Sequence, residues 1–461
     1  MRGTAIRQLN RRQTTTVAMG SVLGAGAFTA LGPAAQVAGW LLPLSVLIAL
    51  IVSLTNAYAS AHIAARWPGS IGTYEAGKHL LGPTGGYIAG WATLVGALAA
   101  IAALARIAGT HMWLAHYPVA AVAVIVLATA FALRGFHRSA PVTAVVVTLV
   151  MVVLAVVLIV ATRSPNIAPD YGIILRNLPL TTASGYVGLG HGAALCYFLY
   201  SGYFLTTCQR QPVNKSSLPR SFTTALLVVS LFYGLLTYGL LTRLGPSIIG
   251  PSPTPVGDLA DLAALRTSLE NIGTIPPGVT AGGVGVTAGI AATAAIVALL
   301  GYCARLLAAM GQAGDLPPIL GHGEHGPPWR GVLSAAVIGL VLALSMTTTA
   351  ALDFCVFALL LAAGLQSLAA WRAWPKGKPV GKMILALSIL GTTLLLICLP
   401  LSVTLAGAVL LGVGLLIRSL LGPASSDADS EGASDAGAPV PRAGNSAATA
   451  PASVGRATDR D

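Results

Sequence analysis

Residues 18–28 read Ala18-Met19-Gly20-Ser21-Val22-Leu23-Gly24-Ala25-Gly26-Ala27-Phe28 and place three glycines inside an apolar run long enough to cross a bilayer. Glycine costs about 1 kcal/mol against alanine in a helix interior. A backbone group that is freed within hydrocarbon is also costly unless protein or water satisfies it. A helix that only had to span the membrane would avoid this stretch, so it predicts a functional interruption at membrane depth.

The composition is that of a membrane protein. Of the 461 residues, 55% are hydrophobic and 9% are charged, and the mean hydropathy is +0.79. Soluble domains carry roughly 25% charged residues. Apolar runs of about 20 residues, the length that a helix needs to cross a bilayer, recur along most of the chain. The expected fold is therefore an all-α polytopic membrane protein.

Hydropathy predicts twelve transmembrane helices, at 14–38, 41–64, 86–112, 118–134, 140–162, 185–208, 221–243, 281–311, 331–350, 352–372, 380–399 and 402–420. The larger polar segments between them are 163–184 and 244–280. Residues 421–461 are rich in Ala, Ser, Asp, Gly and Pro, so we expect a disordered tail.

Lysine and arginine set the expected orientation, because short loops that carry them stay in the cytoplasm. If residues 1–13 are cytoplasmic, the inside segments hold seventeen Lys and Arg and the outside ones hold four, namely Arg163, Arg176, Arg243 and Arg266. We therefore expect a protein of the cell membrane with both termini cytoplasmic. The net charge of +12 follows from this bias and needs no nucleic-acid partner.

The sequence shows no pattern of an enzyme or of a metalloprotein. The five cysteines have no CxxC or Cys/His spacing and lie in predicted helices, at Cys196, Cys208, Cys303, Cys355 and Cys398. They predict neither a disulfide nor a metal site. A phosphate-binding loop and a catalytic triad are also missing, so we expect no enzymatic activity and no cofactor.

A second interruption falls in the sixth predicted helix, where Gly202 lies among the aromatic and polar residues of 196–204. It follows the first by five helices. Breaks at corresponding places in two five-helix halves are typical of inverted-repeat transporters. The halves would be 14–162 and 185–372, with 380–420 as two extra helices. Half-helix ends at such breaks offer N–H groups to a carboxylate and carbonyls to an ammonium.

Several motifs resemble one transporter family. Residues 20–28 look like the first-helix motif G-x-x-x-G-x-G-I-F of the amino acid/polyamine/organocation (APC) superfamily permeases. Residues 64–74 resemble the loop after the second helix of these permeases, and 304–317 are similar to their R-x-x-x-x-M-x-x-D-G-x-x-P segment. Leu352-Asp353-Phe354 opens the tenth helix in the same way. The order of these motifs covers about 14–420 and implies a LeuT-like fold in one transporter domain.

This resemblance implies a secondary transporter, a permease or exchanger, that moves amino acids or related amines by alternating access. A polyamine, nucleobase or other organic-cation transporter, an exporter, and a non-transporting sensor remain alternatives. Some proton-coupled relatives carry a lysine in the fifth helix, and residues 140–161 contain none. We therefore expect exchange (antiport) or weakly coupled transport, with sodium coupling still open. Homo-oligomers are compatible with the sequence.

The resemblance also implies a substrate site at the two breaks, formed by Gly20, Ser21, Gly24, Ala25, Gly26, Phe198, Tyr200, Ser201 and Gly202. It places Phe198 over the substrate and leaves Ala25 only its backbone N–H. On spacing alone, Gly20 and Gly24 would favour close helix packing, and the aromatic residues would favour a core role. The third glycine and the second break shift the balance toward a site.

Two ionisable residues in predicted helices have two interpretations each. Arg106 lies near the outer end of the third helix, where snorkelling to the interface competes with a role in a cavity. His62 lies near the inner end of the second helix, where many relatives carry glutamate. A proton relay and a packing role are both open for His62.

Overall fold

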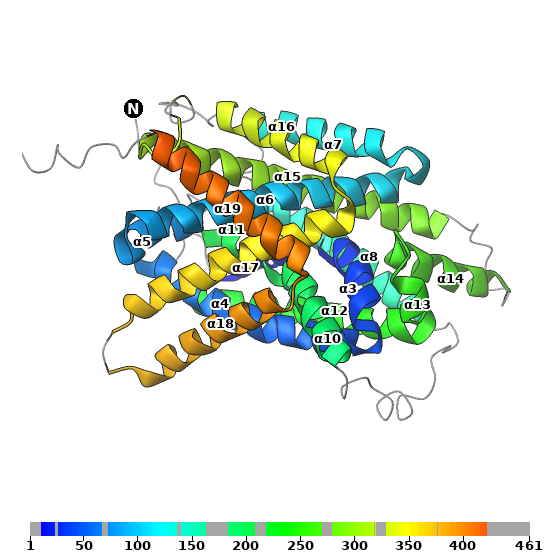
Figure 1. The fold of residues 1–461 in the computed structure, drawn as a ribbon. Helices are drawn as coiled ribbons and strands as arrows, with labels where there is room; N and C mark the ends of the chain where they lie inside the picture. The colour runs from blue at the N-terminus through cyan, green and yellow to red at the C-terminus, as the bar shows by residue number, and fades with distance from the viewer. Residues whose placement is uncertain are drawn as a thin grey trace, which may run out of the picture. The chain divides into compact units, whose positions relative to one another are not determined.

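The computed structural model describes residues 11–23, 26–66, 72–135, 140–162, 183–207, 218–269, 279–317, 319, 329–375 and 377–421. Every regular element in these ranges is a helix, as the sequence predicts (Figure 1). Some parts of the sequence-based prediction lie outside the described residues. These are residues 1–10, Gly24, Ala25, Cys208 and the tail from 422 onward.

The first half of the chain forms short and long helices in alternation. Its elements are α1 (Arg11–Leu23), α2 (Gly26–Thr29), α3 (Leu31–Ala38), η1 (Gly39–Leu41), α4 (Leu42–Arg66), α5 (Gly72–Leu81), α6 (Pro83–Met112), η2 (Leu114–His116), α7 (Tyr117–Leu133) and α8 (Ala140–Ala161).

The second half of the described chain has ten more helices. They are α10 (Ala183–Tyr200), α11 (Tyr203–Thr207), α12 (Leu218–Arg243), α13 (Pro246–Ile249), α14 (Pro255–Leu269), α15 (Val279–Gln312), α16 (Trp329–Ser345), α17 (Thr348–Arg372), α18 (Pro379–Ile397) and α19 (Leu401–Leu421).

Eight helical segments of the described chain are long and apolar enough to cross a membrane. They are Leu31–Arg66, Pro83–Met112, Leu114–Leu133, Leu218–Arg243, Ala281–Gln312, Thr348–Arg372, Pro379–Ile397 and Leu401–Leu420. Shorter apolar helices lie at Ala144–Ile159 and Trp329–Ser345. The protein is therefore a multi-pass membrane protein, while the count of twelve spans and the inverted repeats stay predictions.

Some elements differ from the sequence-based expectation. The helices α5, α13 and α14 lie in segments that we expected to be loops. Pro255 starts α14, and Asp258 lies in its first turn, both of which favour a helix start. The ninth predicted helix ends at Ser345 rather than at 350, because Thr347 caps the next helix by accepting a hydrogen bond from Ala350 N at 3.2 Å.

Helix α6 lies at the centre of the packing. It contacts α5, α7, α15, α16 and α17, and 83% of its most apolar window is buried. Small residues permit these close contacts, since a methyl group at Gly96 would already lie 3.0 Å from the Leu359 side chain. Large apolar side chains are exposed on outer helices, where they suit contact with lipid, for example Val126, Leu231, Val337, Leu394 and Val409.

Candidate functional site

The first predicted interruption centres on Gly24 and Ala25, which lie outside the described residues. The structure describes α1 as far as Leu23 and α2 from Gly26 onward. Ala30 N donates to Gly26 O at 3.1 Å and Ala34 N to Ala30 O at 3.0 Å. Helices α2 and α3 therefore continue one another, and the interruption before Gly26 stays a prediction.

The second interruption lies between α10 and α11 at Ser201 and Gly202. The Ser201 hydroxyl donates to the Phe198 carbonyl at 3.0 Å, which satisfies a carbonyl at the end of α10. The hydroxyls of Tyr197 and Tyr203 lie 3.1 Å apart and connect the two half-helices across the break. The interruption is therefore a stabilised part of the fold.

The second interruption touches the last described turn of α1. A methyl group at Gly202 would overlap the Ser21 carbonyl and lie 3.0 Å from Val22 N. A methyl group at Gly26 would lie 3.3 Å from the Leu199 Cα. The end of α1 and the end of α10 thus meet backbone to backbone, and glycine is needed for this approach.

A tyrosine of α12 joins both breaks. The Tyr233 hydroxyl lies 3.1 Å from Val22 O and 3.4 Å from both Leu23 O and Leu199 O. It can donate to one of them at a time and so serves carbonyls at the ends of α1 and α10. The sequence analysis missed Tyr233, because its helix is a plain apolar run and only the packing reveals its partners.

The candidate residues of the sequence analysis divide into four groups. The structure brings Ser21, Gly26 and Gly202 to the place where α1 meets α10. Phe198 and Tyr200 lie in the last turn of α10 and Ser201 directly follows it, and all three are buried. Gly20 lies in α1, one residue before Ser21, whose hydroxyl bonds to Val17 O of its own helix at 3.0 Å. Gly24 and Ala25 lie outside the described residues.

Tyr200 has an unusual environment. Its ring is fully buried and packs edge to face on Tyr233, with ring centroids 5.5 Å apart. Within the described residues its hydroxyl has no hydrogen-bond partner. A buried polar atom without a partner needs an explanation, and a bound ligand or water is one.

Known proteins of similar sequence match nearly the whole chain. A family model described as amino acid permease covers residues 9–417. The chain belongs to the amino acid permease family. This family is part of the APC superfamily, so the resemblance found in the sequence is confirmed.

The relatives are named as transporters. An uncharacterized transporter of Mycobacterium tuberculosis and one of Mycobacterium bovis are each 30% identical to this permease over 413 residues, which cover 88% of this chain and 90% of each relative. A branched-chain amino acid permease of Lactococcus lactis subsp. cremoris is 25% identical over 364 residues, or 72% of this chain and 75% of that protein.

A buried polar cluster lies beside the second break of the permease. The Asn56 side chain of α4 donates to the Tyr197 hydroxyl at 3.4 Å and accepts from Ser367 at 3.1 Å and Ser388 at 2.6 Å. The two serine hydroxyls lie 2.7 Å apart. The cluster thus links α4, α10, α17 and α18, and its hydrogen bonds satisfy each of these groups.

The structure supports a packing role for Arg106. Its guanidinium donates to Ala343 O at 2.7 Å and Thr348 Oγ1 at 3.2 Å, and it lies 5.0 Å from the centre of the Tyr117 ring. It therefore connects the end of α16 to the start of α17. His62 packs on Trp374 with ring centroids 4.4 Å apart, and the proton-relay interpretation of His62 stays a prediction.

Side chains of α5 and α19 form a charged cluster around Asp315, which follows α15. Its carboxylate lies 2.7 Å from Lys78 Nζ and 3.1 Å from Arg418 Nε, and Tyr74 donates to it at 2.5 Å. Burial, together with this carboxylate, raises the pKa of Tyr74, which keeps its hydroxyl a neutral donor. This cluster attaches α19 and α5 to the segment after α15.

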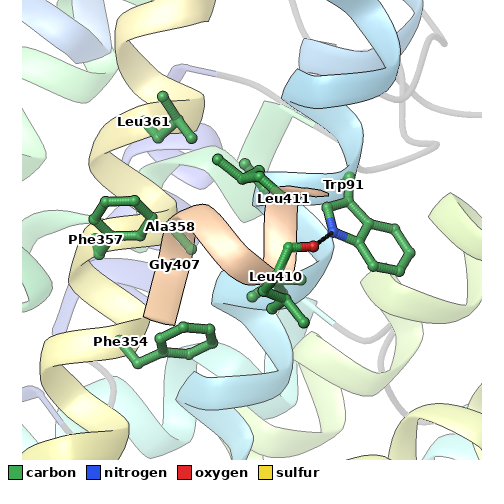
Figure 2. A pocket seen from close by; sticks show the side chains of 10 residues that line it. Trp91, Phe354, Phe357, Ala358, Leu361, Gly407, Leu410 and Leu411 are labelled. Carbon is green, nitrogen blue, oxygen red and sulfur yellow. Dashed lines mark hydrogen bonds between the residues drawn. The ribbon is translucent and has the colours of Figure 1, made fainter. Parts of the chain in front are cut away.

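A pocket between α6, α17 and α19 does not suit a polar substrate. Figure 2 shows its lining, which includes Phe354, Phe357, Gly407 and Leu411. The Trp91 indole at its edge already donates to Leu410 O at 3.1 Å. Its lining residues carry no ionisable side chain, so an ammonium or carboxylate would find no charged partner there.

Proposed function

We propose that this permease is a secondary transporter that moves amino acids or related amines by alternating access, with the substrate bound between the two helix breaks. One observation carries the proposal: the last described turn of α1 and the interruption after α10 meet backbone to backbone at Ser21 and Gly202. Broken helices that cross in the interior of a bundle are typical of transporter sites. The family and the names of the relatives support transport.

The breaks supply groups for both ends of an amino acid. The half-helix that the glycine pattern predicts from Gly26 onward would present unpaired N–H groups and a positive dipole end to a carboxylate. Phe198 and Tyr200 add aromatic faces that suit an ammonium or an apolar side chain. We add Tyr233 to the nine residues of the sequence-based site, because its hydroxyl lies at both breaks.

The charges of the broken helices favour a zwitterion over a polyamine. Residues 11–38 and 183–207 contain no aspartate or glutamate. A second ammonium would therefore enter a region of the fold without a carboxylate on either broken helix, and burying an unpaired charge is costly. An amino acid is the better fit, and the name of the Lactococcus relative directs the first trials to L-leucine, L-isoleucine and L-valine.

Two measurements on purified protein test the proposal. A ligand that binds only the folded state raises the free energy of unfolding by RT ln(1 + [L]/Kd), and the melting temperature rises with it. A panel of amino acids, polyamines, nucleobases and organic cations would therefore identify the ligand class. Exchange of labelled ligand in proteoliposomes then separates a transporter from a sensor. Stabilisation by a ligand without exchange would support the sensor, and no stabilisation by any amino acid would contradict the proposed substrate.

The orientation and the coupling mode belong to the same proposal. We place both termini in the cytoplasm on the asymmetry of lysine and arginine. The start of α17 then lies near the outer face and α5 near the inner face. We propose exchange rather than tight ion coupling, because α8 has no lysine or other ionisable residue.

A further inference from the structure

His191 of α10 and Asp353 of α17 form an ion-pair contact that the proposed substrate site does not use. His191 Nε2 lies 2.8 Å from Asp353 Oδ1, and the two side chains are 13% and 8% exposed. His191 lies in α10, ten residues before Ser201 at the break, and Asp353 lies in the second turn of α17. The pair therefore connects a broken helix to an unbroken one.

Within the described residues, each member of the pair has the other as its ion-pair partner. Nearby on the helices that pack against α10 and α17, Arg106 binds Ala343 and Thr348, and the His111 ring contacts Phe28. The thiol of Cys398 lies beside Gly190. Besides His191, helix α10 carries the titratable residues Tyr186, Cys196, Tyr197 and Tyr200. The other titratable residues of α17 and of the helices packed against the pair's two helices are Arg11, Arg12, Tyr58, His62, Arg66, Tyr74, Glu75, Lys78, His79, Tyr87, Arg330, Cys355, Arg372, Lys382 and Arg418.

The charge of the pair depends on one proton. With the proton on the imidazole, a cation faces a carboxylate and the pair is neutral as a whole. Without it, one negative charge remains in a mostly buried place, and such a charge is costly unless water or a cation reaches it. Histidine is the side chain that exchanges a proton under physiological conditions.

We propose that His191 and Asp353 form a proton-binding site that holds α10 against α17 when it is occupied. The inference rests on the proposed function, because α10 is one of the two broken helices. When the imidazole releases its proton to water, the carboxylate stays ionised and attracts water, and α10 separates from α17 at this end. The proton enters and leaves from the same end, so the site controls opening and carries no proton across the membrane.

The proposal predicts how pH changes the apparent affinity for substrate. A ligand that needs the open state binds with an apparent Kd equal to the intrinsic Kd divided by the open fraction. Raising the pH removes this proton and should strengthen the apparent affinity for external substrate about tenfold. In His191→Gln and Asp353→Asn, the apparent affinity should change by less than about twofold over the same rise in pH.

The experiment measures exchange of labelled L-leucine by the full-length permease in right-side-out membrane vesicles, with equal pH on both sides and empty-vector vesicles as background. His116→Gln is the matched control, since His116 is an exposed histidine of η2 that follows the C-terminal end of α6. It should keep the wild-type pH profile. Asp353→Glu keeps the carboxylate and should retain the pH dependence that Asp353→Asn loses.

Each outcome separates this inference from the proposed function. Exchange that does not depend on pH, or a wild-type profile that survives in both His191→Gln and Asp353→Asn, overturns the proton site and leaves the transporter intact. A folded wild type that neither binds nor exchanges L-leucine overturns the leucine assignment and this inference with it. If a variant exchanges too slowly, its melting temperature against pH decides: a response equal to that of wild type also overturns the site.

Discussion

At the scale of the residue, Gly202 is fixed by a contact. A methyl group there would overlap the Ser21 carbonyl, which is backbone and cannot rotate away. We expect Gly202→Ala to lower the free energy of unfolding by about 1–3 kcal/mol and to reduce exchange strongly. Gly234→Ala is the control, because a methyl group at Gly234 of α12 meets open space. Melting temperature and exchange that match wild type in Gly202→Ala would contradict the crossing of the breaks.

Phe198 tests whether an aromatic ring covers the substrate. It lies one turn before the break with 9% of its surface exposed, so a substrate role and a core role both fit. As a substrate contact, Phe198→Ala should weaken affinity, by about 0.5–2 kcal/mol if the ring faces an ammonium, and Phe198→Tyr or Phe198→Trp should retain part of it. Affinity and melting temperature measured on the same variant decide, since lost stability with intact affinity would assign Phe198 to the core.

At the scale of the element, one hydroxyl serves the ends of two helices. Tyr233→Phe removes the donor near Val22 O and Leu199 O and keeps the ring. Leaving buried carbonyls unpaired costs about 1–3 kcal/mol, so the melting temperature and the exchange rate should both fall. Tyr186→Phe on α10, where the tyrosine is 58% exposed, should change neither. A wild-type exchange rate in Tyr233→Phe would show that these helix ends keep their arrangement without the Tyr233 hydroxyl.

The polar cluster of α4, α10, α17 and α18 is a second element-scale feature. Asn56→Ala removes the acceptor of Ser367 and Ser388 and the donor to Tyr197. We expect a loss of about 1–3 kcal/mol of stability from the buried hydroxyls that remain unpaired. Denaturation in detergent measures it, with Thr223→Ala at an exposed hydroxyl as control. A loss of stability no larger than that of the control would show that the cluster does not stabilise the bundle.

At the scale of the whole molecule, the sequence predicts the long apolar helices and the break at Gly202, because hydropathy and glycine act locally. The contact between Ser21 and Gly202 could be expected only from the family resemblance, since nearly two hundred residues separate them. The partners of Tyr233, His191 and Asn56 were not predictable, because single polar residues in apolar helices have no spacing signal. Their roles depend on which helix packs against which.

Coupling is a property of the whole transport cycle. The described helices α1, α8 and α10 contain no aspartate or glutamate that could carry a proton. We expect exchange of internal for external substrate to continue when proton and sodium gradients are dissipated with ionophores. Uptake without internal substrate that collapses under the same treatment would contradict this expectation.

The contact between Gly202 and Ser21 also limits how the permease can move. Two backbones in direct contact leave no layer of side chains that could be compressed or slide. They can still rotate about one another, as two crossed rods turn about a fulcrum. The half-helices would then swing at their far ends while the crossing point keeps its separation. In the proposed alternating-access cycle, a substrate beside that fulcrum would keep its binding distances as access passes from one face of the membrane to the other.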